Sequence, residues 1–185
     1  MDTRREVIGV LGSGKEAHRA WVEPLARWIA SRGYHLLTGA GGGVMGAAAE
    51  AFVAVEGRAG LSLGIVPGAV VDGTWRPKPG YPHPAVELPI HTHLPLSGER
   101  GTEPMSRNHL NVLTARALVA LPGGAGTVSE AVLALRYGRP LILFGPREAF
   151  HAFPAELERT ESLERVCAFL EAAAGGKKEA PGTGE

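Results

Sequence analysis

The chain has 185 residues, of which 44% are hydrophobic, and its 19 Lys and Arg balance 19 Asp and Glu. This length suits one domain with a sizeable core, and the balanced charge disfavours a nucleic-acid polymer or an anionic membrane as a partner. The single cysteine, Cys167, excludes an intramolecular disulfide. Because the first residues also lack a long apolar run, we expect a cytoplasmic protein.

Apolar, β-branched runs alternate along the chain with segments of helical periodicity. The pattern predicts strands at 6–12, 34–39, 60–67, 85–91, 117–123 and 140–145, and helices at 15–33, 44–57, 103–115, 127–138 and 161–174. A Pro/Gly-rich loop is expected at 68–84, and a single domain of residues 1–174 should end in a disordered tail, 175–185. The alternation predicts an α/β fold, a doubly wound, mostly parallel Rossmann-like sheet with helices on both faces.

Three of the predicted strand-to-helix turns are rich in glycine: 12–14, 39–46 and 122–127. Parallel strands place these turns on the same edge of the sheet, where glycine lets backbone N–H groups approach a ligand closely. We therefore expect a phosphate site formed by Gly12, Ser13, Gly41, Gly42, Gly43, Met45, Asn108, Gly123, Gly124, Gly126 and Thr127. Taken singly, each turn is explained equally well by tight turn geometry.

Two common nucleotide motifs are only partly matched by the first turn. The segment GSGKEA at 12–17 fits a loose dinucleotide fingerprint, but the second strand lacks the acid that would hold the ribose. The segment GVLGSGKE at 9–16 has Glu16 where a P-loop needs a Ser or Thr for magnesium. The sequence therefore disfavours a dinucleotide enzyme and excludes a nucleoside triphosphatase.

Thr127 and Glu130 have the T-x-x-E spacing of a capping box, which would explain both residues structurally. The alternative is that Glu130, one turn from a phosphate cradle, faces the sugar of a bound nucleotide. Arg107 is expected to face the same cleft, where its guanidinium suits a phosphate or a base edge. A solvated helix charge is the alternative for Arg107. The chain's two asparagines, Asn108 and Asn111, lie beside it.

Other polar and aromatic residues give weaker signals. His83, His91 and His93 have no acid or cysteine at metal-ligand spacing, so no metal site and no cofactor are predicted. Trp75 and Tyr81, in the loop at 68–84, are candidates for stacking on a base or for surface packing.

Three segments resemble the Lonely Guy superfamily, whose members are often labelled possible lysine decarboxylases. They are GAGGGVMGAAAEA at 39–51, MSRN at 105–108 and LPGGAGTVSEAVLALRYGRPLILFG at 121–145. The family signature is an Arg on one helix followed by P-G-G-x-G-T-x-x-E, and the second motif is complete from Pro122 to Glu130.

The resemblance implies a homodimeric Rossmann-like protein that hydrolyses the N-glycosidic bond of a nucleoside 5′-monophosphate, releasing the base and ribose 5-phosphate. The catalytic residues would be Arg107 and Glu130. Family members with this hydrolase activity carry the motif M-x-x-R-K around the Arg. In this chain Asn108 replaces the Lys, and Met105 stands only two residues before Arg107. A branch without that Lys includes molybdenum-cofactor carriers, so a non-catalytic carrier or sensor of a phosphorylated heterocycle is the alternative.

The decarboxylase label is disfavoured by the lysines of the chain. Pyridoxal chemistry needs a buried Lys for the Schiff base. Lys15 lies on a turn, Lys78 in a loop, and Lys177 and Lys178 in the tail. None of these positions suits a Schiff base.

Overall fold

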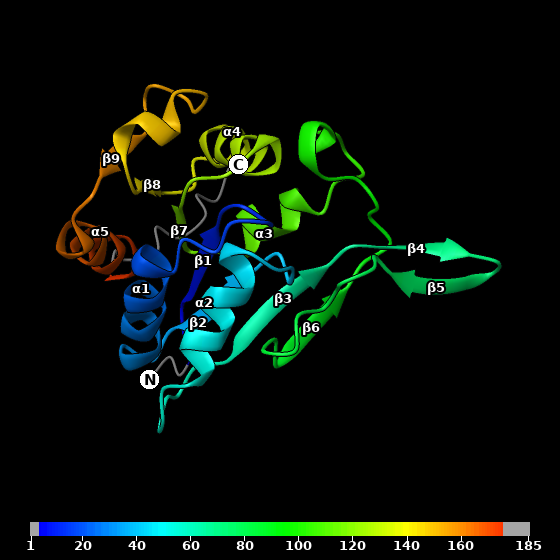
Figure 1. The fold of residues 1–185 in the computed structure, drawn as a ribbon, viewed down its shortest axis with the longest axis horizontal. Coiled ribbons are helices and arrows are strands. Elements are labelled where there is room, and N and C mark those ends of the chain that lie inside the picture. The colour runs from blue at the N-terminus through cyan, green and yellow to red at the C-terminus, as the bar shows by residue number, and fades with distance from the viewer. Residues whose placement is uncertain (1–3, 176–185) are drawn as a thin grey trace, which may run out of the picture.

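A seven-stranded parallel sheet forms the centre of the protein in a computed structural model that describes residues 4–175 (Figure 1). Its strand order is β6-β3-β2-β1-β7-β8-β9. The strands are β1 Val7–Leu11, β2 His35–Thr38, β3 Ser62–Val66, β6 Leu88–His91, β7 Ala117–Ala120, β8 Leu141–Phe144 and β9 Glu158–Thr160, and every pairing among them is parallel. The predicted single α/β, doubly wound Rossmann-like fold is confirmed.

Helices cover both faces of this sheet because successive strand residues point to opposite sides. Ile8 and Val119 pack into an apolar cluster with α1 Arg19–Ser31, α2 Val44–Val53 and α5 Leu163–Gly175. Leu118 and Leu143 point the other way and pack with α3 Asn108–Thr114 and α4 Ala125–Arg136. The central strands are thus buried on both faces, as their continuous apolar runs predict.

The segment predicted as a loop, 68–84, contains a β-hairpin, which corrects that prediction. Strands β4 Gly68–Val71 and β5 Thr74–Pro77 pair antiparallel and extend away from the sheet (Figure 1). Asp72 and Gly73 form the two-residue turn with positive φ angles of 50° and 74°. An Asp-Gly pair is a common signal for such a turn.

Several predicted boundaries also differ from the structure. The first helix begins at Arg19 rather than at residue 15, and α3 begins at Asn108 rather than at 103. Strand β9 was not predicted, and short 3₁₀ helices occur at Gly98–Arg100 and Arg147–Phe150. Gly175, predicted as the first residue of the disordered tail, is instead the last residue of α5, and the rest of that tail lies outside the described residues. Within residues 4–175, no helix is long and apolar enough to cross a membrane.

Candidate functional site

A cavity of about 540 Å³ lies where β1 and β7 end and the helices that follow them begin. Its lining comes from two glycine turns, from α2, α3 and α4, and from the segments after β5 and β6. The lining residues are Gly12, Ser13, Gly14, Lys15, Met45, Lys78, Tyr81, Ser97, Gly98, Arg107, Asn108, Gly124, Gly126, Thr127 and Glu130. The carboxyl edge of the sheet, where ligands bind in such folds, therefore carries the site.

The first and third glycine turns pack directly against each other. The N–H of Ser13 donates a 3.1 Å hydrogen bond to the carbonyl of Pro122. Gly123 lies behind the cavity surface, where a Cβ would collide with the side chain of Thr127. The two turns therefore form one continuous backbone surface at the base of the cavity.

The second glycine turn supports the first one from behind. Gly41, Gly42 and Gly43 are not among the residues that line the cavity, although Met45, in the first turn of α2, is. At Gly43, with a φ of 59°, a Cβ would collide with the carbonyl oxygen of Ser13. These glycines thus allow close backbone packing, and their assignment as phosphate-binding residues stays a prediction.

Arg107 reaches from the start of α3 into the base of the cavity. The residue is 5% exposed, and its Nη1 donates hydrogen bonds of 2.7 Å to the carbonyl of Gly39 and 2.8 Å to that of Ile65. The guanidinium lies 5.6 Å from the ring of Tyr81, and Nε has no hydrogen-bond partner. Desolvation lowers the pKa of the Arg107 guanidinium, while Glu130 opposes that shift. The solvated-charge interpretation of Arg107 is wrong.

Thr127 and Glu130 do not form a capping box. Helix α4 begins at Ala125, two residues before the expected start, so both residues lie inside the helix, and no side chain caps it. The Glu130 side chain does not reach back to the start of the helix but hydrogen-bonds to Asn111, and the residue is 8% exposed. The amides of the first turn of α4 are consequently left without a side-chain partner at the cavity.

The Glu130 carboxylate is held by Asn111 of α3. Asn111 Nδ2 donates a 2.7 Å hydrogen bond to Oε1 of Glu130. Burial raises the pKa of the Glu130 carboxyl above its ordinary value, and Arg107 and Asn111 partly offset this effect. A carboxyl group in such surroundings can donate or accept a proton nearer to neutral pH than an exposed glutamate.

Asn108 stands where the M-x-x-R-K motif has Lys, and it joins two helices. Its side-chain Nδ2 donates hydrogen bonds of 3.2 Å to Oγ of Ser129 and 3.4 Å to the carbonyl of Gly126. The residue is 2% exposed. Asn108 therefore fixes α3 against α4 as well as lining the cavity.

Several residues at the cavity were not predicted as site residues: Asn111, which holds Glu130, and the lining residues Lys15, Lys78, Ser97 and Gly98. One available signal was the i, i+4 spacing of Arg107 and Asn111, which places both on one helix face.

The two aromatic candidates for base stacking have different surroundings. Tyr81 lines the cavity, whereas Trp75 stacks on His91 with a ring separation of 4.6 Å. The Trp75 Nε1 also donates to the carbonyl of Thr92 at 2.9 Å. Trp75 thus fixes the base of the β4–β5 hairpin, and Tyr81 alone of the pair faces the site.

The histidines considered for a metal site make other contacts. His83 Nε2 lies 3.5 Å from Oε1 of Glu50, and His91 packs on Trp75. Across residues 4–175, no group of three or more His, Cys, Asp or Glu side chains is placed to hold a metal ion.

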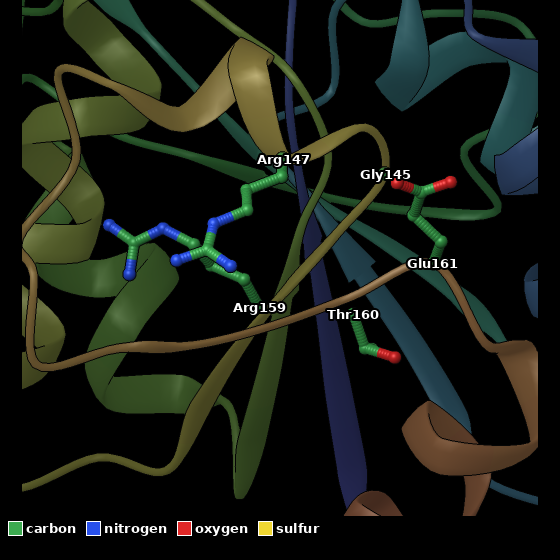
Figure 2. Close-up of a pocket in the computed structure, with 5 residues that line it drawn as sticks. All are labelled: Gly145, Arg147, Arg159, Thr160 and Glu161. Atoms are coloured by element: carbon green, nitrogen blue, oxygen red, sulfur yellow. The ribbon is translucent and has the colours of Figure 1, made fainter.

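A second cavity of about 500 Å³ is lined by residues of β9 and by the segments that follow β8 and β9, and it shares no lining residue with the first. Figure 2 shows Arg147 and Arg159 extending on one side of it and Glu161 on the other. The Arg159 guanidinium donates to four backbone carbonyls, those of Phe153, Pro154, Ala155 and Leu157. Arg159 therefore has a structural role, because it holds the segment 153–157 that precedes β9.

The chain is similar to solved structures over most of its length. The molybdenum cofactor carrier protein of Chlamydomonas reinhardtii is 26% identical, with a TM-score of 0.69 and coverage of 94% of this chain and 100% of that chain. The molybdenum cofactor binding protein of the phototrophic bacterium Rippkaea orientalis is 27% identical, with a TM-score of 0.69 and coverage of 92% and 98%. DNA processing protein A of Helicobacter pylori, at 16% identity, a TM-score of 0.65 and coverage of 89% and 80%, shares the fold.

Comparison with curated proteins finds no match. The sequence profile of the SLOG cluster4 family matches residues 5–173, which is almost the whole chain. The SLOG superfamily includes Rossmann-like folds of the Lonely Guy type. This chain therefore belongs to the SLOG cluster4 family.

Proposed function

We propose that this protein binds a phosphorylated heterocycle of the molybdenum-cofactor type in the cavity between β1 and β7 and does not convert it. The observation that carries the proposal is the uncapped start of α4 beside Gly12 and Ser13, with Gly124, Gly126 and Thr127 at the cavity surface. Free N–H groups at a helix start form an anion site. The cavity volume of about 540 Å³ suits a small ligand.

The contacts of Arg107 and Asn108 favour binding over turnover. Arg107 Nη1 already donates to two backbone carbonyls. Asn108 stands where the hydrolases of the Lonely Guy superfamily have Lys, and its side chain is hydrogen-bonded to Ser129 and Gly126. The two named molybdenum-cofactor proteins, at 26% and 27% identity, support the same assignment. This proposal includes the homodimer that the family resemblance implies. It does not include binding to a nucleic-acid polymer or to a membrane.

Mass spectrometry of the small molecules released from the purified protein tests this proposal. We expect a phosphorylated heterocycle at close to one equivalent per chain, and re-addition of that compound to stripped protein should restore the complex. Release of an unphosphorylated compound, or of none after exposure to a molybdenum-cofactor source, would contradict the assignment.

A second candidate function is hydrolysis of nucleoside 5′-monophosphates, which the buried Glu130 carboxyl beside Arg107 favours. The C1′–N bond would break through an oxocarbenium-like state, as in other glycosidic cleavage. Water would add its OH to C1′ and its proton would pass by way of Glu130 to the departing base, with Arg107 binding the base or the phosphate. Glycine turns holding the phosphate would position C1′.

An assay for ribose 5-phosphate on a panel of nucleoside monophosphates separates the two candidates. Hydrolysis predicts release from at least one of them, lost in Glu130→Gln while nucleotide binding persists. A carrier predicts no release from any nucleotide, in the wild type as in the variant.

A further inference from the structure

Two lysines at the cavity lie on segments far apart in the sequence. Lys15 follows the first glycine turn, and Lys78 follows β5. Both side chains are exposed at the cavity rather than buried in its base. Lys15 comes directly after the glycines of the first turn, and Lys78 belongs to no glycine motif.

The backbones that carry these lysines are held firmly in place. The N–H of Lys15 donates to Oγ of Ser13 at 3.1 Å. The N–H of Lys78 donates to the carbonyl of Pro67 at 2.9 Å, and the N–H of Tyr81 returns to the carbonyl of Lys78 at 3.0 Å. The Lys78 Nζ lies 6.0 Å from the ring of Tyr81. Fixed backbones thus bring two long cationic side chains to the same opening.

The cavity has an excess of positive charge, although the whole chain is neutral. Its lining contains the cations Lys15, Lys78 and Arg107, and Glu130 is the only carboxylate among its described residues. Arg107 and Glu130 interact with each other in the base. Within residues 4–175, no ion pair joins either lysine to an acid. Both ammonium groups are therefore available to a ligand.

We propose that Lys15 and Lys78 bind a second anionic group of the ligand, separate from the phosphate held by the glycine turns and the start of α4. This inference rests on the proposed binding function and specifies its ligand class. The ligand carries two anionic groups, as a diphosphate does, whereas a nucleoside monophosphate carries one. Charge gathered in a cleft raises the local concentration of such an anion.

Calorimetric titration with inorganic phosphate and inorganic pyrophosphate at low ionic strength tests the inference. We expect pyrophosphate to bind more tightly to the wild type. Lys15→Met and Lys78→Met, which keep the apolar stem of the side chain, should each weaken pyrophosphate binding about 3-fold and together about 10-fold, as for exposed ion pairs. Phosphate affinity should change by less than about 2-fold, because the glycine turns bind it.

Two further variants separate a specific contact from a general loss of charge. Arg76→Ala removes an exposed cation of β5 that does not line the cavity, and pyrophosphate affinity should stay unchanged. The double variant Lys15→Arg and Lys78→Arg should keep the preference for pyrophosphate.

The outcomes distinguish this inference from the proposed function. Equal affinity for the two anions, or an equal loss in Arg76→Ala, contradicts the second anion site and leaves phosphate binding standing. Failure of both anions to bind contradicts the proposed function together with the inference.

Discussion

The side-chain amide of Asn111 donates a 2.7 Å hydrogen bond to Oε1 of Glu130, and both side chains are almost fully buried. The pair joins α3 to α4 directly below the cavity. The Oδ1 of Asn111 has no hydrogen-bond partner, so the side-chain amide is held through its Nδ2 donor. The carboxylate therefore depends on Asn111 for its neutral donor and on Arg107 for its countercharge.

Asn111→Leu should destabilise the protein in a pH-dependent way. The substitution keeps the side-chain volume but removes the donor to Glu130, which leaves an ionised carboxylate short of a partner. We expect a loss of about 1–3 kcal/mol in the free energy of unfolding at pH 7, and a smaller loss as the pH is lowered and the Glu130 carboxyl, whose pKa burial raises, takes up its proton. Denaturant unfolding at several pH values measures both.

Asn108→Leu is the matched control for this prediction. Asn108 bonds to the neutral groups of Ser129 and Gly126, so its loss should not vary with pH over the same range. Equal pH dependence in the two variants would show that the Asn111 donor does not act on the charge of Glu130.

Glu130→Gln should reduce the loss of stability that the wild type suffers as pH rises. The folded-state pKa of the Glu130 carboxyl lies above the unfolded value of about 4.3, because burial disfavours its charge. Its contribution to stability is fully present below the unfolded pKa and is lost as pH rises through the folded pKa. The variant cannot ionise, so its melting temperature relative to the wild type should increase between pH 4 and pH 8. A difference that is constant or decreases over this range is incompatible with the raised pKa.

The central strands could be predicted because they are buried on both faces. The run at 117–123 is almost wholly apolar, and β7 lies within it. Strand β9 could not be found in this way, because Glu158–Thr160 forms the sheet edge and contains no apolar run. The β4–β5 hairpin has a readable Asp-Gly turn, but its flanks have exposed charges and prolines that are also typical of a loop.

The motif at 122–130 could place Thr127 and Glu130 near one cavity because the motif itself spans the turn and the first helical turns. Lys78 and Tyr81 belong to no motif, and they reach the site because the chain folds back after β5. The N–H of His83 donates to the carbonyl of Ala40 at 2.8 Å, which holds that segment against the second glycine turn. Such long-range contacts have no local signal in the sequence.

Tyr81→Ala should weaken binding of a phosphorylated heterocycle by about 5-fold or more, since stacking of a base on an aromatic ring contributes about 1–3 kcal/mol. Tyr81 is the aromatic side chain that lines the cavity, and its ring also faces the Arg107 guanidinium. Tyr81→Phe keeps the ring and should retain most of the affinity. Titration with a nucleoside monophosphate and with inorganic phosphate measures the effect, and phosphate affinity should not change in either variant. A similar loss for both ligands would place Tyr81 at the phosphate instead of at the heterocycle.

Gly124→Asp should strongly weaken phosphate binding without unfolding the protein. Gly124 is the N-cap of α4 at the cavity surface, and a Cβ there would meet nothing within 4 Å. Aspartate is a favoured N-cap residue, so the melting temperature should stay the same or rise. Its carboxylate would accept hydrogen bonds from the free amides of α4 and repel the phosphate, and we expect affinity to fall at least about 10-fold. Gly124→Ala, which adds no charge, should lose much less affinity. If Gly124→Asp melts like the wild type and binds inorganic phosphate equally well, the phosphate does not lie at the start of α4.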